Sequence, residues 1–163
     1  MADLKFVIGD PRVCTGCMIC VNVCSMRYFK VISPERSRVR AVRIEPGLDF
    51  TLFCRNCEDA PCIDACPEDA LSRTSKGVVI VNNKKCTGCG SCVEACPYDA
   101  IRINPDTEKA IKCIQCDECI KRCPVDAIWM TTMRELEERD PDGEIWALHE
   151  EHSEELYSKE DLQ

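Results

Sequence analysis

The apolar residues of this chain fall in short runs that are separated by turn residues. Residues 4–8 alternate weakly ahead of a Gly-Asp-Pro turn, and residues 78–81 and 101–103 are apolar runs bounded by Gly, Asn and Pro, so each predicts a short strand. Residues 36–44 end at a Glu-Pro-Gly turn and predict another strand. No run is long enough to form a large core, and we therefore expect small two-stranded hairpins.

The periodicity becomes helical after residue 130. Residues 133–139 predict a short helix and residues 144–156 predict a second helix, with an Asp-Pro-Asp-Gly turn between them. The second helix has one stripe formed by Ile145, Leu148, His152 and Leu156. Residues 131–163 contain 12 acidic and 3 basic side chains. We therefore expect a solvated, acidic helical tail that presents Trp146 and Leu148 to a partner.

All 16 cysteines lie in four motifs of four. Residues 86–97 and 113–124 have the spacing C-x2-C-x2-C-x3-C-P, in which three cysteines surround one iron–sulfur cube and the fourth reaches another cube. Residues 54–67 have four residues instead of two between the second and third cysteines. Residues 14–24 are followed by Ser25 in place of the proline. No cysteine is left outside these motifs.

This spacing favours [4Fe–4S] clusters over the other uses of cysteine. Tetrahedral zinc sites take their ligands as separated pairs, whereas a cube is reached by three cysteines from one tight loop. Disulfides are typical of secreted chains, and residues 1–9 contain neither an apolar signal segment nor a twin arginine. Core packing would not impose the same three intervals four times. A structural or regulatory module that binds zinc is the alternative to an iron–sulfur protein.

Three motifs continue into a shared signature, C-P-x-D-A-[IL], at residues 66–71, 96–101 and 123–128. The proline fixes φ and removes a hydrogen-bond donor, so the chain turns away from the cluster. The alanine and the following Ile or Leu place apolar groups against it. Little apolar sequence lies outside these segments. We therefore expect bound clusters to supply much of the folding free energy.

The formal net charge of −8 is concentrated in the tail, because residues 1–130 contain 17 acidic and 18 basic side chains. This near-neutral body lacks the basic surface of a nucleic-acid-binding domain. Residues 27–45 hold six bases against two acids, which indicates either a solvated hairpin face or a docking surface for an acidic partner. No apolar run has the length of a membrane span. Reduced cysteines and the absence of a signal segment favour a cytoplasmic location.

The order of the motifs resembles that in the dimethyl sulfoxide reductase iron–sulfur subunit family, over residues 10–130. The short form with Cys14-Thr15-Gly16-Cys17 near the N-terminus is most similar to the small subunits of tungsten aldehyde oxidoreductases and of tungsten benzoyl-CoA reductase complexes. The resemblance implies an α+β fold, a small irregular double bacterial-ferredoxin-like fold of two two-cluster units, one inserted in the other. Short hairpins and a helical C-terminal tail complete it.

The resemblance also implies domain boundaries and ligands. A four-cluster polyferredoxin domain would span residues 1–130, with an inserted ferredoxin unit at 54–104 and the acidic helical tail at 131–163. Four [4Fe–4S] clusters would pair the first motif with the fourth and the second with the third. Cluster 1 would take Cys14, Cys17, Cys20 and Cys123, and cluster 2 would take Cys113, Cys116, Cys119 and Cys24. Cluster 3 would take Cys54, Cys57, Cys62 and Cys96, and cluster 4 would take Cys86, Cys89, Cys92 and Cys66.

Nothing in the sequence suggests substrate chemistry, since no G-x-G-x-x-G follows a strand and no base is paired with a nucleophile. We therefore expect a non-catalytic electron-transfer subunit whose cluster-loop amides, at Gly16, Gly88 and Gly90, tune the reduction potentials. The resemblance implies a large tungsten or molybdenum pterin subunit as one partner, and a flavin or NAD subunit or a ferredoxin as the second carrier. The alternatives are a free diffusible polyferredoxin and an electron-transfer subunit of a hydrogenase or carbon monoxide dehydrogenase system.

Overall fold

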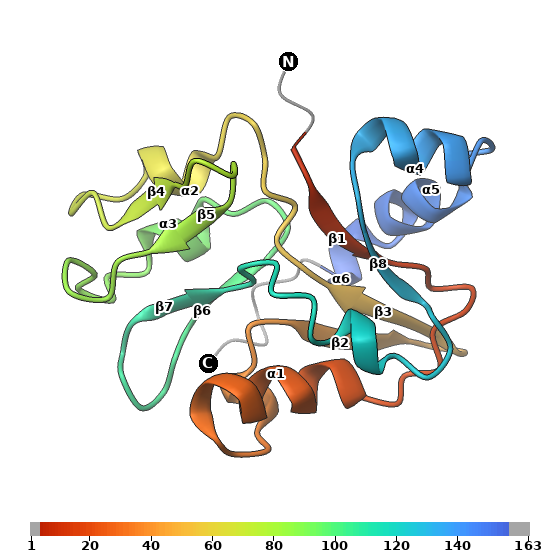
Figure 1. The fold of residues 1–163 in the computed structure, drawn as a ribbon, viewed down its shortest axis with the longest axis horizontal. Helices are drawn as coiled ribbons and strands as arrows, with labels where there is room; N and C mark the ends of the chain where they lie inside the picture. The colour runs from red at the N-terminus through yellow and green to blue at the C-terminus, as the bar shows by residue number, and fades with distance from the viewer. Residues whose placement is uncertain (1–3, 157–163) are drawn as a thin grey trace.

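The computed structural model describes residues 4–156, which form short strands and helices joined by long loops (Figure 1). The strands are β1 (Phe6–Gly9), β2 (Arg40–Ile44), β3 (Leu48–Leu52), β4 (Leu71–Arg73), β5 (Val79–Val81), β6 (Ile101–Ile103), β7 (Ala110–Lys112) and β8 (Ile128–Thr131). The α-helices are α1 (Ile19–Phe29), α2 (Pro61–Asp64), α3 (Ser91–Glu94), α4 (Met133–Arg139), α5 (Glu144–Glu151) and α6 (Ser153–Leu156). Single 3₁₀ turns occupy Pro34–Arg36 and Ile120–Arg122.

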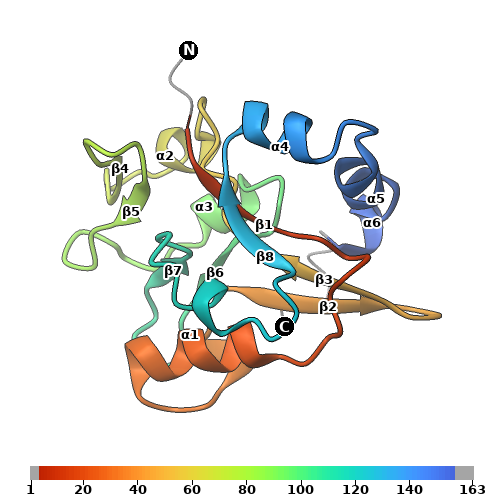
Figure 2. The same ribbon diagram turned by 45° about the vertical axis from the view of Figure 1, so that its right-hand side comes forward.

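The strands pair as four separate two-stranded antiparallel sheets, β1–β8, β2–β3, β4–β5 and β6–β7. The prediction of short antiparallel hairpins is confirmed, and β6 has the predicted bounds. The β1–β8 pair is not a hairpin and could not be predicted from local pattern, because it sets Phe6 near the start of the described chain opposite Thr131 near its end. Figure 2 shows these two strands side by side at the centre of the molecule.

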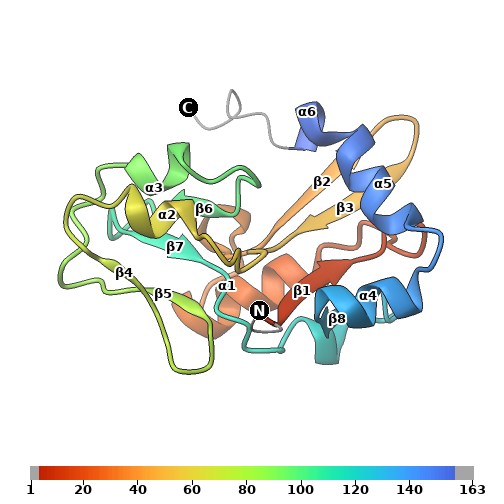
Figure 3. The ribbon, with the colours of Figure 1, turned by 90° about the horizontal axis from the view of Figure 1, so that it is seen from above.

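The elements divide between two ends of the molecule. Helices α2 and α3 and the β4–β5 hairpin lie at one end, whereas the β1–β8 and β2–β3 pairs and helices α4–α6 lie at the other (Figures 1 and 3). The larger buried apolar group at each end contains cysteines, and Ala100 packs against both of these groups. The two ends are therefore packed together through residues that follow the cysteine motifs.

Cysteines make up much of both buried groups. The group that includes Val7, Val21 and Ile128 contains five cysteines among its ten buried residues, and the group that includes Leu71, Val79 and Ile101 contains four among ten. Apolar side chains therefore surround sulfur atoms instead of packing mainly on one another.

Three arginines at positions 36–43 form ion pairs within the chain. The pairs are Arg36 with Asp106, Arg40 with Asp99 and Arg43 with Asp49. Asp99 is fully buried and belongs to the C-P-x-D-A signature of the third motif, so its pair with Arg40 joins the β2–β3 hairpin to that motif. These contacts favour an internally paired hairpin over a docking surface for an acidic partner.

The tail packs on the body of the chain, and the prediction of a solvated tail helix is wrong. Helix α4 has the predicted bounds and begins at a capping box formed by Thr132 and Glu135. The second predicted helix is divided into α5 and α6, because the helix stops at His152. Residues 157–163 of the predicted tail lie outside the described residues.

Burial of the apolar stripe holds the tail in place. Ile145 packs with Phe6 and Ile8, and Leu156 packs with Phe50 and Leu52. Leu148, which was expected to face a partner, packs beside this second set. Within residues 4–156, no helix combines the length and the apolar character that crossing a membrane requires.

His149 lies on the buried face of α5 and is only 3% exposed. Its Nε2 lies 3.4 Å from the Gly9 carbonyl oxygen, its ring meets the edge of Phe50 at 5.1 Å between centroids, and its Nδ1 has no hydrogen-bond partner among the described residues. Burial, helped by the positive charge of Arg55, lowers the pKa of His149 to about 4, while the Gly9 carbonyl and Asp10 act in the opposite direction.

We expect acid to release α5 through His149. Below about pH 6.5 the histidine of the undocked tail binds a proton that the docked histidine does not, so docking weakens as the pH falls toward 4. Between pH 7.5 and pH 5 the opening free energy should fall by about 2 kcal/mol. Hydrogen exchange of the α5 amides, corrected for intrinsic exchange, measures this change. His149→Gln should abolish most of it, and His152→Gln should retain it; equal slopes in the two variants would contradict the assignment.

Candidate metal centres

The 16 cysteines, all free thiols, surround four cavities with four cysteines at each. Cavity 1 is lined by Cys14, Cys17, Cys20 and Cys123, and cavity 2 by Cys24, Cys113, Cys116 and Cys119. Cavity 3 is lined by Cys54, Cys57, Cys62 and Cys96, and cavity 4 by Cys66, Cys86, Cys89 and Cys92. Each cavity thus joins three cysteines of one motif to the fourth cysteine of another. The four cavities are similar in size.

Each three-cysteine loop has residues in the left-handed backbone region at two fixed positions. The first lies two residues after the first cysteine, and the second lies two residues before the third cysteine. These residues are Gly16 and Met18, Asn56 and Ala60, Gly88 and Gly90, and Gln115 and Asp117. The left-handed turns curl the loop so that its three sulfurs face one cavity. Gly88 also has a steric reason to be glycine, because a Cβ there would overlap the Glu108 carbonyl oxygen.

The C-P-x-D-A signature forms a hydrogen bond to the fourth cysteine. The amides of Ala70, Ala100 and Ala127 donate to the Sγ atoms of Cys66, Cys96 and Cys123 at 3.3, 3.4 and 3.3 Å. The aspartate before each alanine has a positive φ, a conformation that Asp tolerates better than most residues. The signature is therefore a turn that returns an amide to the ligand sulfur.

The first motif ends differently because its fourth cysteine lies inside a helix. Cys24 and Ser25 are both within α1, where a proline at position 25 would remove a helical hydrogen bond and clash with the preceding turn. The Sγ of Cys24 accepts a hydrogen bond from the Arg38 amide instead, at 3.3 Å. The serine in place of proline thus reflects a helix that continues past the cysteine.

Further amides donate to the first cysteine of a loop. The Asn56 and Gln115 amides donate to the Sγ atoms of Cys54 and Cys113, each at 3.4 Å. The Gly16 amide makes the equivalent hydrogen bond to Cys14, as expected from the sequence. At the third motif the Ala110 amide donates to Cys86, at 3.4 Å, and the expected roles of the Gly88 and Gly90 amides stay predictions. Amide donors stabilise a thiolate, so these loops suit deprotonated cysteine ligands.

Burial keeps these thiols neutral. Together with smaller contributions from neighbouring thiols, it raises the pKa of Cys20 to about 12 and the pKa of Cys62 and Cys92 to about 11. Ionisation near neutral pH therefore requires a nearby positive charge, which bound iron would supply. Four sulfur donors with amide hydrogen bonds around a common cavity fit the ligand chemistry of a [4Fe–4S] cluster. Among residues 4–156, no three His, Cys, Asp or Glu side chains are grouped to bind a single metal ion.

The four cavities adjoin one another in the order 1, 2, 3, 4. One buried apolar group contains Cys20 of cavity 1, Cys113 of cavity 2 and Cys54 of cavity 3, and the other contains cysteines of cavities 3 and 4. Cys17 of cavity 1 and Cys89 of cavity 4 are the exposed cysteines of the described chain, and the rest are buried or half-buried. The terminal cavities therefore reach the surface directly.

A buried cation lies between cavities 2 and 3. Lys112 at the end of β7 is 1% exposed, and its Nζ donates to the Val79 and Cys113 carbonyl oxygens at 2.6 and 3.1 Å. Val79 lines cavity 3 and Cys113 lines cavity 2. Burial raises the pKa of both Cys62 and Cys113, and the Lys112 charge opposes this effect at each. The sequence analysis missed Lys112. The signal that could have indicated it is a lysine that follows two apolar residues and directly precedes a cysteine.

Two domain families match the sequence. The 4Fe–4S dicluster domain family matches residues 48–137, and the 4Fe–4S binding domain family matches residues 11–27. Among curated proteins, the polyferredoxin-like subunit of aliphatic sulfonate oxidoreductase from Pyrococcus furiosus is 41% identical over 88 residues, which are 53% of this chain and 51% of that protein. The electron transport protein HydN of Escherichia coli is 32% identical over 106 residues, 61% of this chain and 59% of HydN.

The chain thus spans little more than half the length of these two relatives. Among solved structures, one chain of the active site complex BamBC of benzoyl coenzyme A reductase aligns with 78% of this chain and 79% of its own length, at 26% identity and a TM-score of 0.44. The dicluster match covers more than half of the present chain. The protein therefore belongs to the 4Fe–4S dicluster domain family.

Proposed function

We propose that this protein is the electron-transfer subunit of an oxidoreductase complex and carries single electrons through four [4Fe–4S] clusters, one in each cavity. The observation that carries the proposal is the meeting, at every cavity, of three cysteines from one motif with the fourth cysteine of another. A bound cluster of this kind takes up and gives up one electron at a time. The proposed ligands are the cysteines that line cavities 1 to 4.

The same exchange supports the proposed double-ferredoxin arrangement. Cavities 1 and 2 share the first and fourth motifs, and cavities 3 and 4 share the second and third. We assign the four-cluster domain to residues 1–130, the inserted unit to 54–104 and the tail to 131–163. Within each unit the two cavities are joined by the cysteines that the motifs exchange, and the two units meet at Lys112. We infer that electrons follow one linear route through the four clusters, with an exposed cysteine at each end.

The proposed partners are a large catalytic subunit with a tungsten or molybdenum pterin and a second carrier, such as a flavin or NAD subunit or a ferredoxin. The similarity to a polyferredoxin-like oxidoreductase subunit supports a catalytic partner. A free diffusible polyferredoxin is the second candidate. A free carrier would need neither a basic hairpin nor an apolar tail stripe for docking to a partner, but the hairpin arginines are paired within the chain and the tail stripe is buried, so neither feature argues against it. We place the protein in the cytoplasm, whose reducing conditions suit 16 free thiols.

Substitution of exchanged cysteines tests the ligand sets. We expect Cys24→Ala to alter the same paramagnetic signal as Cys116→Ala, because both line cavity 2, and a different signal from Cys17→Ala, which affects cavity 1. Electron paramagnetic resonance during a reductive titration of the holoprotein measures this. If Cys24→Ala and Cys17→Ala alter one common signal, the fourth cysteine stays with its own motif and the exchange is wrong.

Removal of the buried cation tests the order of the clusters. Lys112→Gln retains a hydrogen-bond donor and removes a positive charge that favours the reduced, more negative state of the clusters in cavities 2 and 3. Their two potentials should fall by roughly 40–90 mV, from an interaction on the order of 1–2 kcal/mol. Lys76→Gln, at an exposed turn, is the control and should change no potential by more than a small part of this. Unchanged potentials in Lys112→Gln would contradict the proposed junction.

Metal analysis of the native assembly tests the function. Anaerobic purification of the chain from its own host should yield about 16 irons per chain together with tungsten or molybdenum on a larger companion. Full iron on a chain that elutes alone would identify a free polyferredoxin. A colourless protein with stoichiometric zinc would overturn the iron–sulfur assignment altogether.

A further inference from the structure

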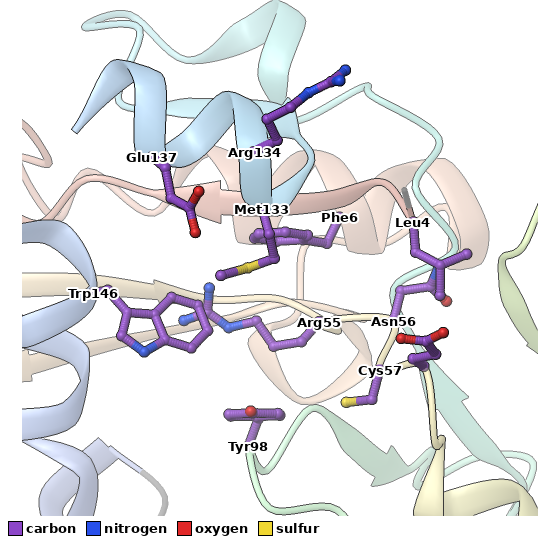
Figure 4. Close-up of a pocket in the computed structure, with 11 residues that line it drawn as sticks. Leu4, Phe6, Arg55, Asn56, Cys57, Tyr98, Met133, Arg134, Glu137 and Trp146 are labelled. Atoms are coloured by element: carbon purple, nitrogen blue, oxygen red, sulfur yellow. The ribbon is translucent and has the colours of Figure 1, made fainter. Parts of the chain in front are cut away.

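A pocket of about 570 Å³ opens between β1, the loop of the second motif and helices α4 and α5 (Figure 4). This volume is within the range of small-molecule sites, which are typically 300–1,000 Å³. The pocket is separate from the four cysteine cavities, and neither the cluster sites nor the proposed electron route accounts for it.

The pocket shares a wall with cavity 3. Arg55, Asn56, Cys57 and Tyr98 line both spaces. Figure 4 shows the sulfur of Cys57 directed into the space beside the Tyr98 ring. A molecule in the pocket would therefore lie against a cysteine of cavity 3, which is an interior cavity of the array.

Aromatic faces form the other walls. The guanidinium carbon of Arg55 lies 4.7 Å from the centre of the Trp146 ring, 5.7 Å from that of Tyr98 and 5.9 Å from that of Phe6. The Trp146 indole N–H donates to Glu150 at 2.7 Å, which fixes the orientation of this ring. Met133, 46% exposed, reaches over the pocket from α4 with an adaptable thioether. Flat walls with one adjustable edge favour a planar aromatic ligand.

Arg55 is half-buried, and its guanidinium is not fully satisfied by the protein. Its Nη1 is buried with no hydrogen-bond acceptor among the described residues, and no described carboxylate lies within ion-pair distance of it. An unsatisfied buried donor in a native protein calls for an explanation, and here Nη1 is closed off by the surrounding side chains. The other guanidinium nitrogens of Arg55 are not closed off in this way, so a ligand oxygen in the pocket can accept a hydrogen bond from them.

The charges of the pocket restrict the ligand further. Arg55 and Arg134 are matched by Glu58 and Glu137 around the rim, so the lining has no excess positive charge for a phosphate. A neutral ring whose carbonyl oxygens accept hydrogen bonds suits this balance better than a nucleotide chain does.

We propose that this pocket binds a planar aromatic ring with carbonyl oxygens, the chemistry that isoalloxazines and quinones share. Trp146 and Tyr98 border the ring, and Arg55 donates to a carbonyl oxygen. The site gives the array a third point of access, at cavity 3, in addition to the exposed cysteines of cavities 1 and 4. Binding at this pocket depends on the aromatic walls and Arg55, and it does not require the cluster ligands to be assigned as proposed above.

Equilibrium dialysis in the dark, under anaerobic conditions and with oxidised holoprotein, tests the proposal. The probes are riboflavin and 2,3-dimethyl-1,4-naphthoquinone, which has no open quinone ring position for thiols to attack. We expect saturable binding of at least one probe at one site per chain. Binding of riboflavin alone identifies the isoalloxazine as the ligand ring, and binding of the naphthoquinone alone identifies the quinone.

Matched arginine variants assign the binding to the pocket. Arg55→Met should weaken binding at least about tenfold, because the donor is lost while an apolar stem still packs on the rings. Arg139→Met is the control: Arg139 also stacks on a tryptophan, 3.9 Å from the centre of Trp129, but does not line the pocket, and its variant should bind within about twofold of the parent. Trp146→Leu provides a second test on the opposite wall and should weaken binding as well.

Two results would overturn the proposal. One is the absence of binding of both probes to fully loaded protein at millimolar concentration, which would leave Arg55 as a structural contact between α5 and the body. The other is binding that neither Arg55→Met nor Trp146→Leu weakens. Iron content, measured on the same samples, reports on the proposed function separately, so that low iron and absent ring binding are distinguished.

Discussion

The arrangement of this protein depends on one requirement, that sulfur atoms from two distant segments meet at each cavity. Cys123 reaches the loop of the first motif and Cys24 reaches the loop of the fourth, so the beginning and the end of the body must lie together. The β1–β8 pair satisfies this requirement, since Phe6 lies opposite Thr131 directly outside the two motifs. The apolar residues are too few to impose such a topology by themselves, and they pack around the cysteines instead.

Burying so many thiols would oppose folding unless their charge were compensated once they ionise. The chain supplies small compensations at many points: backbone amides directed at Sγ atoms, as at Cys24 and Cys66, and the cation of Lys112 at the boundary of two cavities. Each of these is worth less than the charge of a bound metal. The protein therefore makes small adjustments to the charge around the thiolates, most of which bound iron would compensate. This agrees with the formal charge of residues 1–130, which is close to zero.

The sequence predicted the features that are local in the chain. Cysteine intervals and the C-P-x-D-A signature indicated the loops, and apolar runs with turn residues indicated β6 and α4 to the residue. The pairing of β1 with β8 was missed because it is non-local. The arginines at 36–43 and the stripe around Leu148 were assigned to solvent or to a partner because composition does not distinguish an external partner from another part of the same chain. Lys112 was missed because its burial depends on two cavities that only the fold brings together.

The tail gains a physical role from its contacts. Without α4 and α5, the loop that carries Cys57 would face water across an open surface, because Met133 and Trp146 form the outer walls of the pocket beside it. The buried stripe of Ile145 and Leu156 fixes those walls on the body, while the acidic side chains of α4 and α5 remain on the solvent side. Cavity 3 thereby borders a lined pocket, whereas cavities 1 and 4 expose a cysteine directly. Access at the ends of the array suits contact with proteins, and access at its interior suits a flat molecule small enough to enter between aromatic rings.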